Sequence, residues 1–582
     1  MSGAPTPAAP PELTVRAILT GMALGAVLTP CNVYSGLKIG WAFNMSVAAG
    51  LLAFAVWKTG ERAWGSRHWG LLENNINQTA ASSAAAIISS GLAAPIPALA
   101  LLTGKELPWG YLSLWLFAVS LLGVVVAAGL RRQMLARRGL AFPSGVATAE
   151  TIRQIHSGGR EAGERLKVLF SAAGIAGGLK LFNDLAVTLP RLAPALKLPG
   201  GATFANLGFA LDSSLLMAGF GAIAGMRAAL SALVGAVLAW GLLGPLALAR
   251  GWAAPGPGDP DASWFAPLVE WLLWPGATLM VVAALTSFAA IGVRALRRQN
   301  NAARNTRLPP TLTRNQHIGA VAIAFVAGIL AQVFLFGISA FEALLAVLLS
   351  YGLAVVAGWV SGQTGITPVG ALGKVTQLTF GLVSPGNVTA NLMSANVTGG
   401  AAGQCADMLH DMRTGQIIGA TPRFQVCAQL FGVLTGSLAG AAAYLLIIPD
   451  PQAMLITPEW PAPAVATWKA VAQVLSGGLA AMPEGALPAM GVACIAGVAL
   501  ALAETVLPDR ALRYVPSATA MGLGFVIPAW NSVSFFLGAL GALAITRLAP
   551  RWAANRLVVL AAGLIVGESL AGVIGALATL VE

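Results

Sequence analysis

The stretch LLENNINQTAASSAAAIISSGL, residues 71–92, decides how this chain folds and where its function lies. A second stretch of the same kind, SPGNVTANLMSANVTGGAAGQCADMLHD, occupies residues 384–411. Both place amide, hydroxyl and carboxylate side chains inside a chain of 582 residues that is 57% hydrophobic and 10% charged. Polar groups in hydrocarbon are costly unless they pair or contact water. We therefore expect both stretches to line a cavity in a membrane protein that moves a polar solute.

The composition indicates an all-α polytopic membrane protein, because soluble domains contain about 25% charged residues. The 68 glycines and 34 prolines fit this class, since both are more frequent in membrane helices than in soluble ones. Segments 142–155, 363–404 and 466–482 are apolar but interrupted by Gly, Pro or Asn, which predicts re-entrant or discontinuous elements. The net charge of +12 is better explained by Arg in cytoplasmic loops than by nucleic-acid binding.

Basic residues give the orientation and the organisation of the chain. They gather in three loops, at 58–67, 131–138 and 294–314. Even numbers of apolar runs separate these loops, so all three lie on the same side of the membrane. Because basic loops are usually cytoplasmic, this places the loops and the N-terminus in the cytoplasm. Residues 1–12 lack the features of a signal peptide and are expected to form a disordered cytoplasmic tail. A basic cytoplasmic linker, 294–316, then joins two membrane halves, 13–293 and 317–582.

Weak internal similarity predicts that these two halves are related. FPSGVAT at 142–148 resembles VPSAT at 515–519, and each half contains one Asn-rich stretch. Independent origin of these short motifs is the alternative. Two halves with matching broken segments are typical of transporters whose solute site lies at the repeat interface.

We expect the solute to lie between the halves, near mid-membrane. Side-chain amides donate and accept hydrogen bonds at once, which suits peptide bonds and carboxylates. Two further residues follow an expected helix break at Pro30 and Asn32; either they bind substrate, with Lys38 balancing a carboxylate, or they anchor the helix at the membrane interface. The substrate-binding candidates are Tyr34, Lys38, Asn74, Asn75, Gln78, Thr79, Thr364, Gln377, Asn387 and Asn391.

Two carboxylates are predicted to carry a coupling proton. A carboxyl in a low-dielectric cavity can load and release a proton near physiological pH. Glu73 adjoins the first amide cluster, which would link its protonation to solute occupancy, and Glu150 follows the broken segment that begins at Pro143. Glu504 and Asp184 are the next candidates.

Motifs for catalysis, nucleotide binding and metal binding are missing from the sequence. No H-E-x-x-H occurs, and GALGK at 370–374 is followed by Val375 instead of the Ser or Thr of a phosphate loop. Cys405, Asp407, His410 and Asp411 match no standard metal-site spacing, and they lead into an expected loop where charges are solvated. The sequence therefore predicts neither an enzyme, nor a cofactor, nor a bound metal, and transport must be driven by an ion or solute gradient.

Five segments together resemble the oligopeptide transporter superfamily, which includes the yellow-stripe-like metal–chelate transporters, and they are most similar to its bacterial branch. The resemblance implies roughly 14–16 membrane helices in duplicated halves and proton-coupled uptake of small peptides or peptide-like metal chelates. One departure is Ser384-Pro385-Gly386, where peptide-transporting eukaryotic members have Asn-Pro-Gly. The segments are ELTVRAILTGMALGAVLTPCNVYSGLKIGW (12–41), LLENNINQTAASSAAA (71–86), LAFPSGVATAE (140–150), TGITPVGALGKVTQLTFGLVSPG (364–386) and GQCADMLHDMRTGQIIGATPRFQVCAQLFG (403–432).

We therefore predict a proton-coupled symporter of the bacterial inner membrane that imports small peptides or peptide-like metal chelates. The expected partners are that solute, protons and the lipid bilayer, without nucleic acid, and a homodimer is left open. A channel or exporter for another small polar solute is the first alternative, and a membrane-embedded enzyme is the second. The polar stretches are poor in Arg, which favours a zwitterionic solute over a polyphosphate.

Overall fold

The computed structural model describes residues 11–136, 140–157, 160–194, 202–298, 311–365, 367–478 and 482–578. Within these ranges the chain is helical, with one isolated bridge between Leu192 and Leu211 and no strand. Twelve of the described helices are long and apolar enough to cross a membrane, which confirms the all-α polytopic class. The expected count of 14–16 spans stays a prediction. The predicted tail 1–12 and linker 294–316 lie largely outside the described residues.

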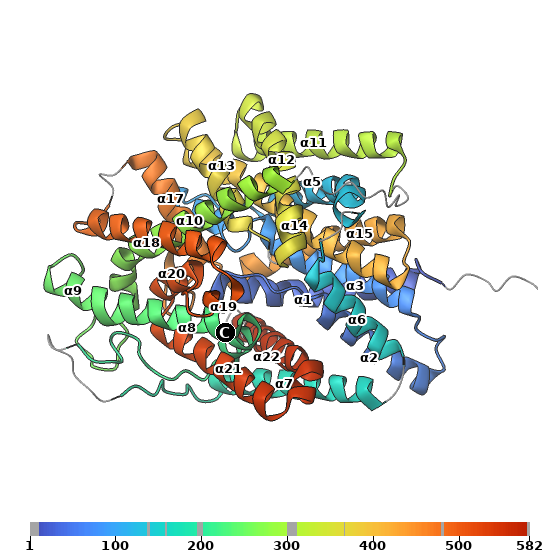
Figure 1. Cartoon of the computed structure of the whole chain (residues 1–582), viewed down its shortest axis with the longest axis horizontal. Helices are drawn as coiled ribbons and strands as arrows, with labels where there is room; N and C mark the ends of the chain where they lie inside the picture. The colour runs from blue at the N-terminus through green and yellow to red at the C-terminus, as the bar shows by residue number, and fades with distance from the viewer. Residues whose placement is uncertain are drawn as a thin grey trace, which may run out of the picture.

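The helices pack as two bundles (Figure 1). The first bundle takes its first members from the start of the chain: α1 (Val15–Ile39), α2 (Ser46–Trp64), α3 (Leu71–Ala85), the 3-10 helix η1 (Ala86–Ser90), α4 (Pro95–Thr103), α5 (Trp109–Ala136) and α6 (Pro143–His156). Its later members are α11 (Arg314–Phe336), α12 (Ala340–Thr364), α13 (Val369–Val383), α14 (Val388–Ile418), α15 (Pro422–Ile447), α16 (Pro451–Met454) and α17 (Pro463–Gly477).

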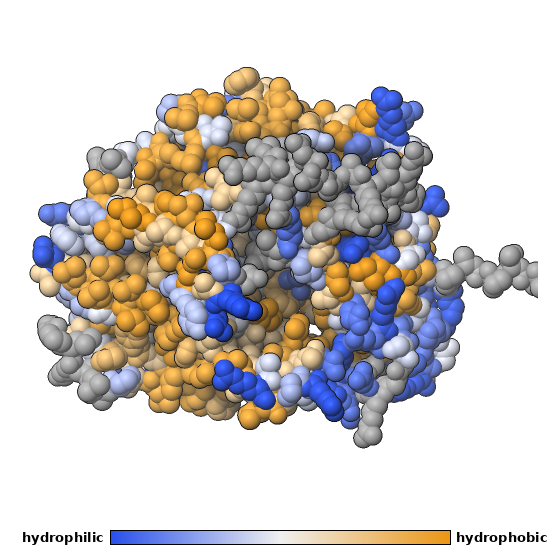
Figure 2. Space-filling view, viewed as in Figure 1, coloured by the Kyte–Doolittle hydropathy of each residue, from blue (hydrophilic) through white to orange (hydrophobic). Residues whose placement is uncertain are grey.

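The second bundle also combines early and late helices. It contains α7 (Arg160–Leu185), α8 (Leu215–Ala236), the π-helix η2 (Val237–Leu243), α9 (Gly244–Ala249), α10 (Phe265–Arg298), α18 (Ala486–Val506), α19 (Asp509–Leu512), α20 (Ala518–Val526), α21 (Ala529–Leu548) and α22 (Pro550–Ala578). Each bundle therefore draws helices from both predicted halves, so the halves are interwoven. Figure 2 shows hydrophilic side chains gathered where α2 and α6 lie, and apolar side chains over much of the remaining face.

Glycines let the helices of the first bundle approach closely. Gly432 and Gly436 of α15 lie against α3, where an added Cβ would meet the carbonyl oxygens of Ala80 and Ala84 at 2.1 and 2.4 Å. Only a residue without a side chain fits such a contact between two backbones. Gly432 and Gly436 are four residues apart, which places them on one face of α15, and this face packs against α3.

One expected helix break is absent. The break predicted at Pro30 and Asn32 is wrong, because α1 continues through Pro30 to Ile39. Asn32 donates from Nδ2 to the carbonyls of Phe43 and Ala85 and accepts from the Phe43 N–H, so it fixes the connection that follows α1. A proline is tolerated inside a membrane helix where its neighbours satisfy the freed backbone groups.

The prediction that segment 363–404 is discontinuous is confirmed: α12 ends at Thr364, α13 covers Val369–Val383, and the continuous helix α14 begins at Val388. The segments 142–155 and 466–482 coincide largely with helices α6 and α17, whose 14 and 15 residues are fewer than the roughly 20 that cross a bilayer, so their re-entrant character stays a prediction. The first polar stretch is a further discontinuous helix: α3 ends at Ala85, and the chain passes through η1 and a turn before α4 begins at Pro95. Proline at the start of α4 disfavours helical geometry in the residue before it.

Candidate functional site

The two polar stretches lie face to face. Helix α14 runs beside α3 and η1 in the opposite direction. Residues late in the first polar stretch therefore face residues early in the second, and the reverse. Residues 391 and 411 of α14 are 20 positions apart in one continuous helix, or about 30 Å, which matches the hydrocarbon thickness of a bilayer. We call the buried polar side chains along this length the polar column. The facing pairs are Gly91 with Asn396, Ser90 with Gly400, Ser89 with Gly403, Ser83 with Gln404, and Gln78 with Asp411.

One end of the polar column holds the buried carboxylate of Asp411, which is 1% exposed. Its Oδ1 accepts from the hydroxyl of Ser46 in α2 at 3.2 Å. With its amide oriented to satisfy its neighbours, Gln78 donates to the same Oδ1 at 3.2 Å. Asp411 Oδ2 has no partner within the described ranges, and no cation of these ranges pairs with the carboxylate. The site therefore holds a carboxyl group surrounded by neutral donors.

The neighbouring imidazole ties three helices together. His410 Nδ1 accepts from the Gly145 N–H of α6 at 3.4 Å, and its Nε2 lies 2.9 Å from the Ser361 hydroxyl of α12. This arrangement assigns the proton to Nε2, which donates to Ser361. His410 thus anchors α6 and α12 to α14 beside the Asp411 carboxylate.

The other end of the polar column joins α13, α14 and α17. The amide of Gln377 donates to Asn391 Oδ1 at 3.1 Å, and Asn391 donates back to the Gln377 carbonyl at 2.7 Å. One turn before Gln377, the ammonium of Lys374 lies 4.0 Å from the centre of the Trp468 ring. Lys374 is 4% exposed, so an amino group lies deep in the protein.

Many polar atoms of the polar column and its surroundings are buried without a hydrogen-bond partner. A buried polar atom without a partner is costly, and native proteins contain few of them. Their concentration between α3, α13, α14 and α15 indicates a region built to hydrogen-bond a guest or water. Within the described residues these atoms are Asn74 Oδ1, both amide atoms of Asn75, Asn77 Oδ1, Lys374 Nζ, Gln377 Oε1, Ser394 Oγ, both amide atoms of Asn396, Gln404 Oε1, Asp411 Oδ2 and both amide atoms of Gln429.

The predicted coupling residues lie in different surroundings. The carboxylate of Glu73 is fully buried at the start of α3 and accepts from Arg16 at 2.5 Å and from Arg67 at 3.0 Å. Two guanidinium groups stabilise its charged form, which favours a structural ion pair. Glu150 is exposed on α6 and accepts from Gln154 one turn later at 2.7 Å. Neither residue contacts Asp411, and the proton role assigned to them stays a prediction.

Tyr34 and Lys38 form a separate group at the far end of α1. Lys38 donates to the Glu459 carbonyl and lies 4.8 Å from the Trp460 ring and 5.5 Å from the Tyr34 ring. The two aromatic rings meet edge to face with centroids 5.2 Å apart. These contacts fit the anchoring alternative and leave the substrate role of both residues a prediction.

The other candidates divide between the polar column and its edges. Gln78, Gln377 and Asn391 belong to it, and Thr79 lies 3.5 Å from Gln425 Nε2. Asn74 donates to the Gly50 carbonyl at 3.2 Å, whereas exposed Asn387 caps α14 by accepting from Ala390 N at 3.0 Å. The side chain of Thr364 lies outside the described residues. The structure thus brings several predicted residues onto one path, but not into one cluster.

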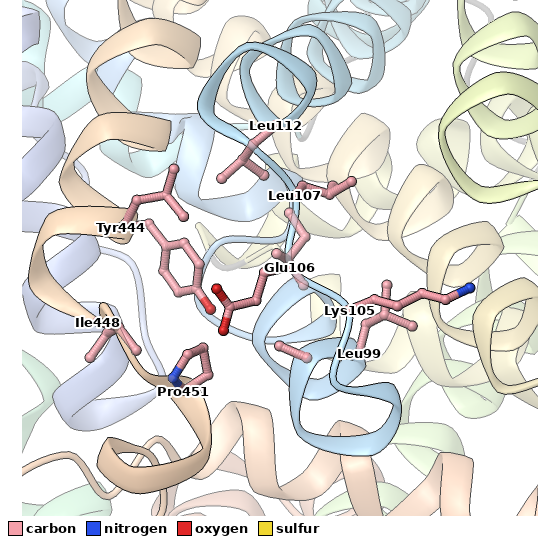
Figure 3. A pocket seen from close by; sticks show the side chains of 11 residues that line it. Leu99, Lys105, Glu106, Leu107, Leu112, Tyr444, Ile448 and Pro451 are labelled. Carbon is pink, nitrogen blue, oxygen red and sulfur yellow. The ribbon is translucent and has the colours of Figure 1, made fainter.

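A surface pocket opens beside the loop between α4 and α5. Figure 3 shows the Glu106 carboxylate and the Tyr444 hydroxyl directed toward one another inside it. A second pocket shares Lys105 and Glu106 and reaches Thr389, two residues before Asn391 in α14. The Asn391 end of the polar column therefore lies close to a surface opening.

Sequence reasoning missed the functional potential of Asp411, Lys374 and Asn396. The sequence places Asp411 at the start of an expected solvated loop, and Lys374 stands out only as the lysine of an incomplete phosphate motif. One signal was available: Asn396, Gln404 and Asp411 are spaced by 8 and 7 residues, which places them within about 80° of one another on a helix. Gly399, Gly400 and Gly403 lie between these positions, and glycines argue against a continuous helix in the sequence.

Comparisons with known proteins agree with this architecture. The sequence model of the OPT oligopeptide transporter protein family matches residues 12–579. The chain is 24% identical to the "Putative oligopeptide transporter YGL114W" of Saccharomyces cerevisiae, over 97% of this chain and 96% of the yeast protein. It is 22% identical to the "Metal-nicotianamine transporter YSL2" of Arabidopsis thaliana, over 96% and 92%. A rice protein, "Probable metal-nicotianamine transporter YSL5" of Oryza sativa subsp. japonica, is 24% identical over 98% and 95%.

Proposed function

The chain belongs to the OPT oligopeptide transporter family, and from this membership we propose that it is a proton-coupled secondary active transporter that imports small peptides or peptide-like metal chelates. Its curated relatives are named as transporters of oligopeptides and of metal–nicotianamine, not as enzymes. We further propose that it resides in a bacterial inner membrane with the start of α1 in the cytoplasm. The basic residues Arg16, Arg62 and Arg67 at that end support this orientation.

The observation that carries the proposal is the polar column. Its buried amides, with unpartnered donors and acceptors, extend over about the thickness of a bilayer core. Amides of this kind suit peptide bonds and carboxylates, which both peptides and peptide-like chelates contain. Asn75 and Asn391 remain our proposed contacts to the solute, the first because its whole amide lacks a partner and the second because it belongs to the polar column.

We propose that Asp411 carries the coupling proton, with Glu73 and Glu150 as the alternatives from the sequence. Its support is geometric: the carboxylate is buried, no described cation neutralises it, and one oxygen lacks a partner. Such a carboxyl group can exist in either protonation state without breaking an ion pair. Glu73, by contrast, would have to leave Arg16 and Arg67 without a counter-charge.

Uptake into proteoliposomes tests this function. Purified protein should take up di- to pentapeptides or an iron–nicotianamine complex, and this uptake should be saturable. It should require a pH gradient in which the outside of the vesicles is acidic and the inside is neutral. Protein-free vesicles should show no such uptake. Asn75→Ala and Asn391→Ala should weaken uptake at unchanged expression. Ohmic ion currents would indicate a channel, and chemical conversion of the solute would indicate an enzyme. Wild-type affinity in both Ala variants would refute the placement of the solute.

A further inference from the structure

A buried lysine side chain that no acidic group of the described residues contacts lies in α13. Lys374 Nζ has no hydrogen-bond partner within the described ranges of the chain, and the side chain is 4% exposed. Its one favourable contact in those ranges is the Trp468 ring, 4.0 Å away. A cation–π contact offsets only part of the penalty for removing an ammonium from water. The side chain therefore has the properties of a binding group whose partner comes from outside the protein.

A second unpartnered atom lies close by on the same helix face. Gln377 follows Lys374 by three residues, so the two side chains are neighbours on α13. Gln377 Nε2 donates to Asn391 Oδ1 at 3.1 Å and lies 3.4 Å from the Trp468 carbonyl, which fixes the orientation of the amide. Its Oε1 consequently faces away from these acceptors and has no partner. An unpartnered cation thus lies beside an unpartnered acceptor.

We propose that Lys374 binds a carboxylate of the transported solute and that Gln377 Oε1 accepts from a nitrogen donor of the same solute. The inference rests on the proposed function and adds the chemical group that the solute must carry. A free carboxylate next to an N–H group occurs at the C-terminus of a peptide and in amino-carboxylate chelators. Phosphate recognition usually recruits Arg or several cations, whereas in the described part of the chain Lys374 is the cation that lies beside the Trp468 ring and Gln377.

The same geometry predicts that replacing Lys374 weakens solute binding but does not destabilise the ligand-free protein. Replacing a buried amino group that lacks a partner, while keeping the aliphatic stem, should stabilise the ligand-free protein. Lys374→Met should therefore unfold at the same temperature as wild type or higher, so loss of binding cannot be attributed to misfolding. Lys469→Met is the matched control, because Lys469 follows Trp468 directly and is only partly buried.

Thermal unfolding of the purified full chain with trialanine, trialanine amide or ferric nicotianamine tests the proposal, since a bound ligand stabilises the native state. Trialanine should stabilise wild type and Lys469→Met. Its affinity should fall about 10- to 100-fold in Lys374→Met, the loss expected for a charge-assisted hydrogen bond. Trialanine amide should bind wild type and Lys374→Met equally weakly.

Two outcomes overturn the inference in distinguishable ways. If the carboxylated probes bind wild type and Lys374→Met equally, Lys374 is not the anchor, and the proposed function is unaffected. If neither trialanine nor ferric nicotianamine binds wild type, the proposed function fails and this inference fails with it. If ferric nicotianamine alone binds wild type, Lys374→Met and Lys469→Met are compared with that complex. Weaker binding by Lys374→Met alone supports the inference, and equal binding by the two variants overturns it.

Discussion

Replacing Glu73 by Gln tests whether this carboxylate is a structural ion pair or a proton carrier. Its charge contacts Arg16, whose side chain is 18% exposed, and Arg67, whose side chain is 59% exposed. Hydrogen bonds to a charged group contribute about 1.5–3 kcal/mol when shielded, whereas an exposed pair contributes about 0–1 kcal/mol. Arg16 would remain over the rings of Trp57 and Trp69 without its counter-charge. We expect Glu73→Gln to lower the free energy of unfolding by about 2–3 kcal/mol.

A double-mutant cycle measures the two pairs separately. Glu73→Gln is combined with Arg16→Met or Arg67→Met, and unfolding is followed in detergent micelles with denaturant at pH 7. The coupling energy should be at least twice as large for Arg16 as for Arg67. Glu150→Gln serves as the control, because that carboxylate is exposed and should change stability by less than about 0.5 kcal/mol. Wild-type stability of Glu73→Gln, or a larger coupling to Arg67, would refute the reasoning.

Three further predictions concern the polar column and its packing. Asp411→Asn keeps an acceptor for the Ser46 hydroxyl but cannot titrate. It should therefore abolish pH-driven accumulation of peptide in proteoliposomes and retain exchange of peptide across the membrane. If Glu73→Gln abolishes accumulation and Asp411→Asn does not, Glu73 is the proton carrier. Gly432→Ala should destabilise the protein by about 1–3 kcal/mol, since its Cβ would lie 2.1 Å from the Ala80 carbonyl oxygen. Gly491→Ala is the control, because open space surrounds that glycine and stability should not change. Equal midpoints of thermal unfolding for the two variants would contradict this prediction. Asn32→Ala leaves the Phe43 N–H and two carbonyls without a partner and should cost about 2–4 kcal/mol in the same assay, and a loss below 1 kcal/mol would show that water replaces the amide.

The sequence predicts the membrane class, the buried polar stretches and the glycine face of α15, because all three depend on residue type alone. It predicts the breaks within 363–404 but not those near the start of the chain. Pro30 is a strong local signal against a helix, yet α1 continues through it, whereas α3 already ends at Ala85, well before the proline that begins α4 at position 95. Local propensity is a weak guide here, since neighbouring helices decide which backbone groups are satisfied.

The same limit explains why Asp411 was misplaced. The segment before it contains Gly399, Gly400 and Gly403, which weaken a helix by about 1 kcal/mol each relative to Ala. In the structure, added Cβ atoms on Gly400 and Gly403 would meet Ser90 Cα at 2.9 Å and Ser89 Cβ at 2.8 Å. These glycines therefore let the continuous helix lie against the broken one. A sequence reading that counts glycines without knowing their neighbours assigns the segment to a loop.

The positions of the two proposed binding groups constrain how coupling can work. Lys374 lies beside Gln377 and Asn391, and Asp411 is 20 residues farther along α14, about 30 Å away. An extended tripeptide spans at most about 11 Å, so one solute cannot contact both groups at once. If both proposals hold, solute and proton must influence one another through a structural element that both sites share. That element is α14, since Asn391 and Asp411 belong to the same continuous helix, and His410 ties its Asp411 end to α6 and α12. Coupling in this chain would then depend on movement of α14 against its neighbours and not on direct contact between solute and proton.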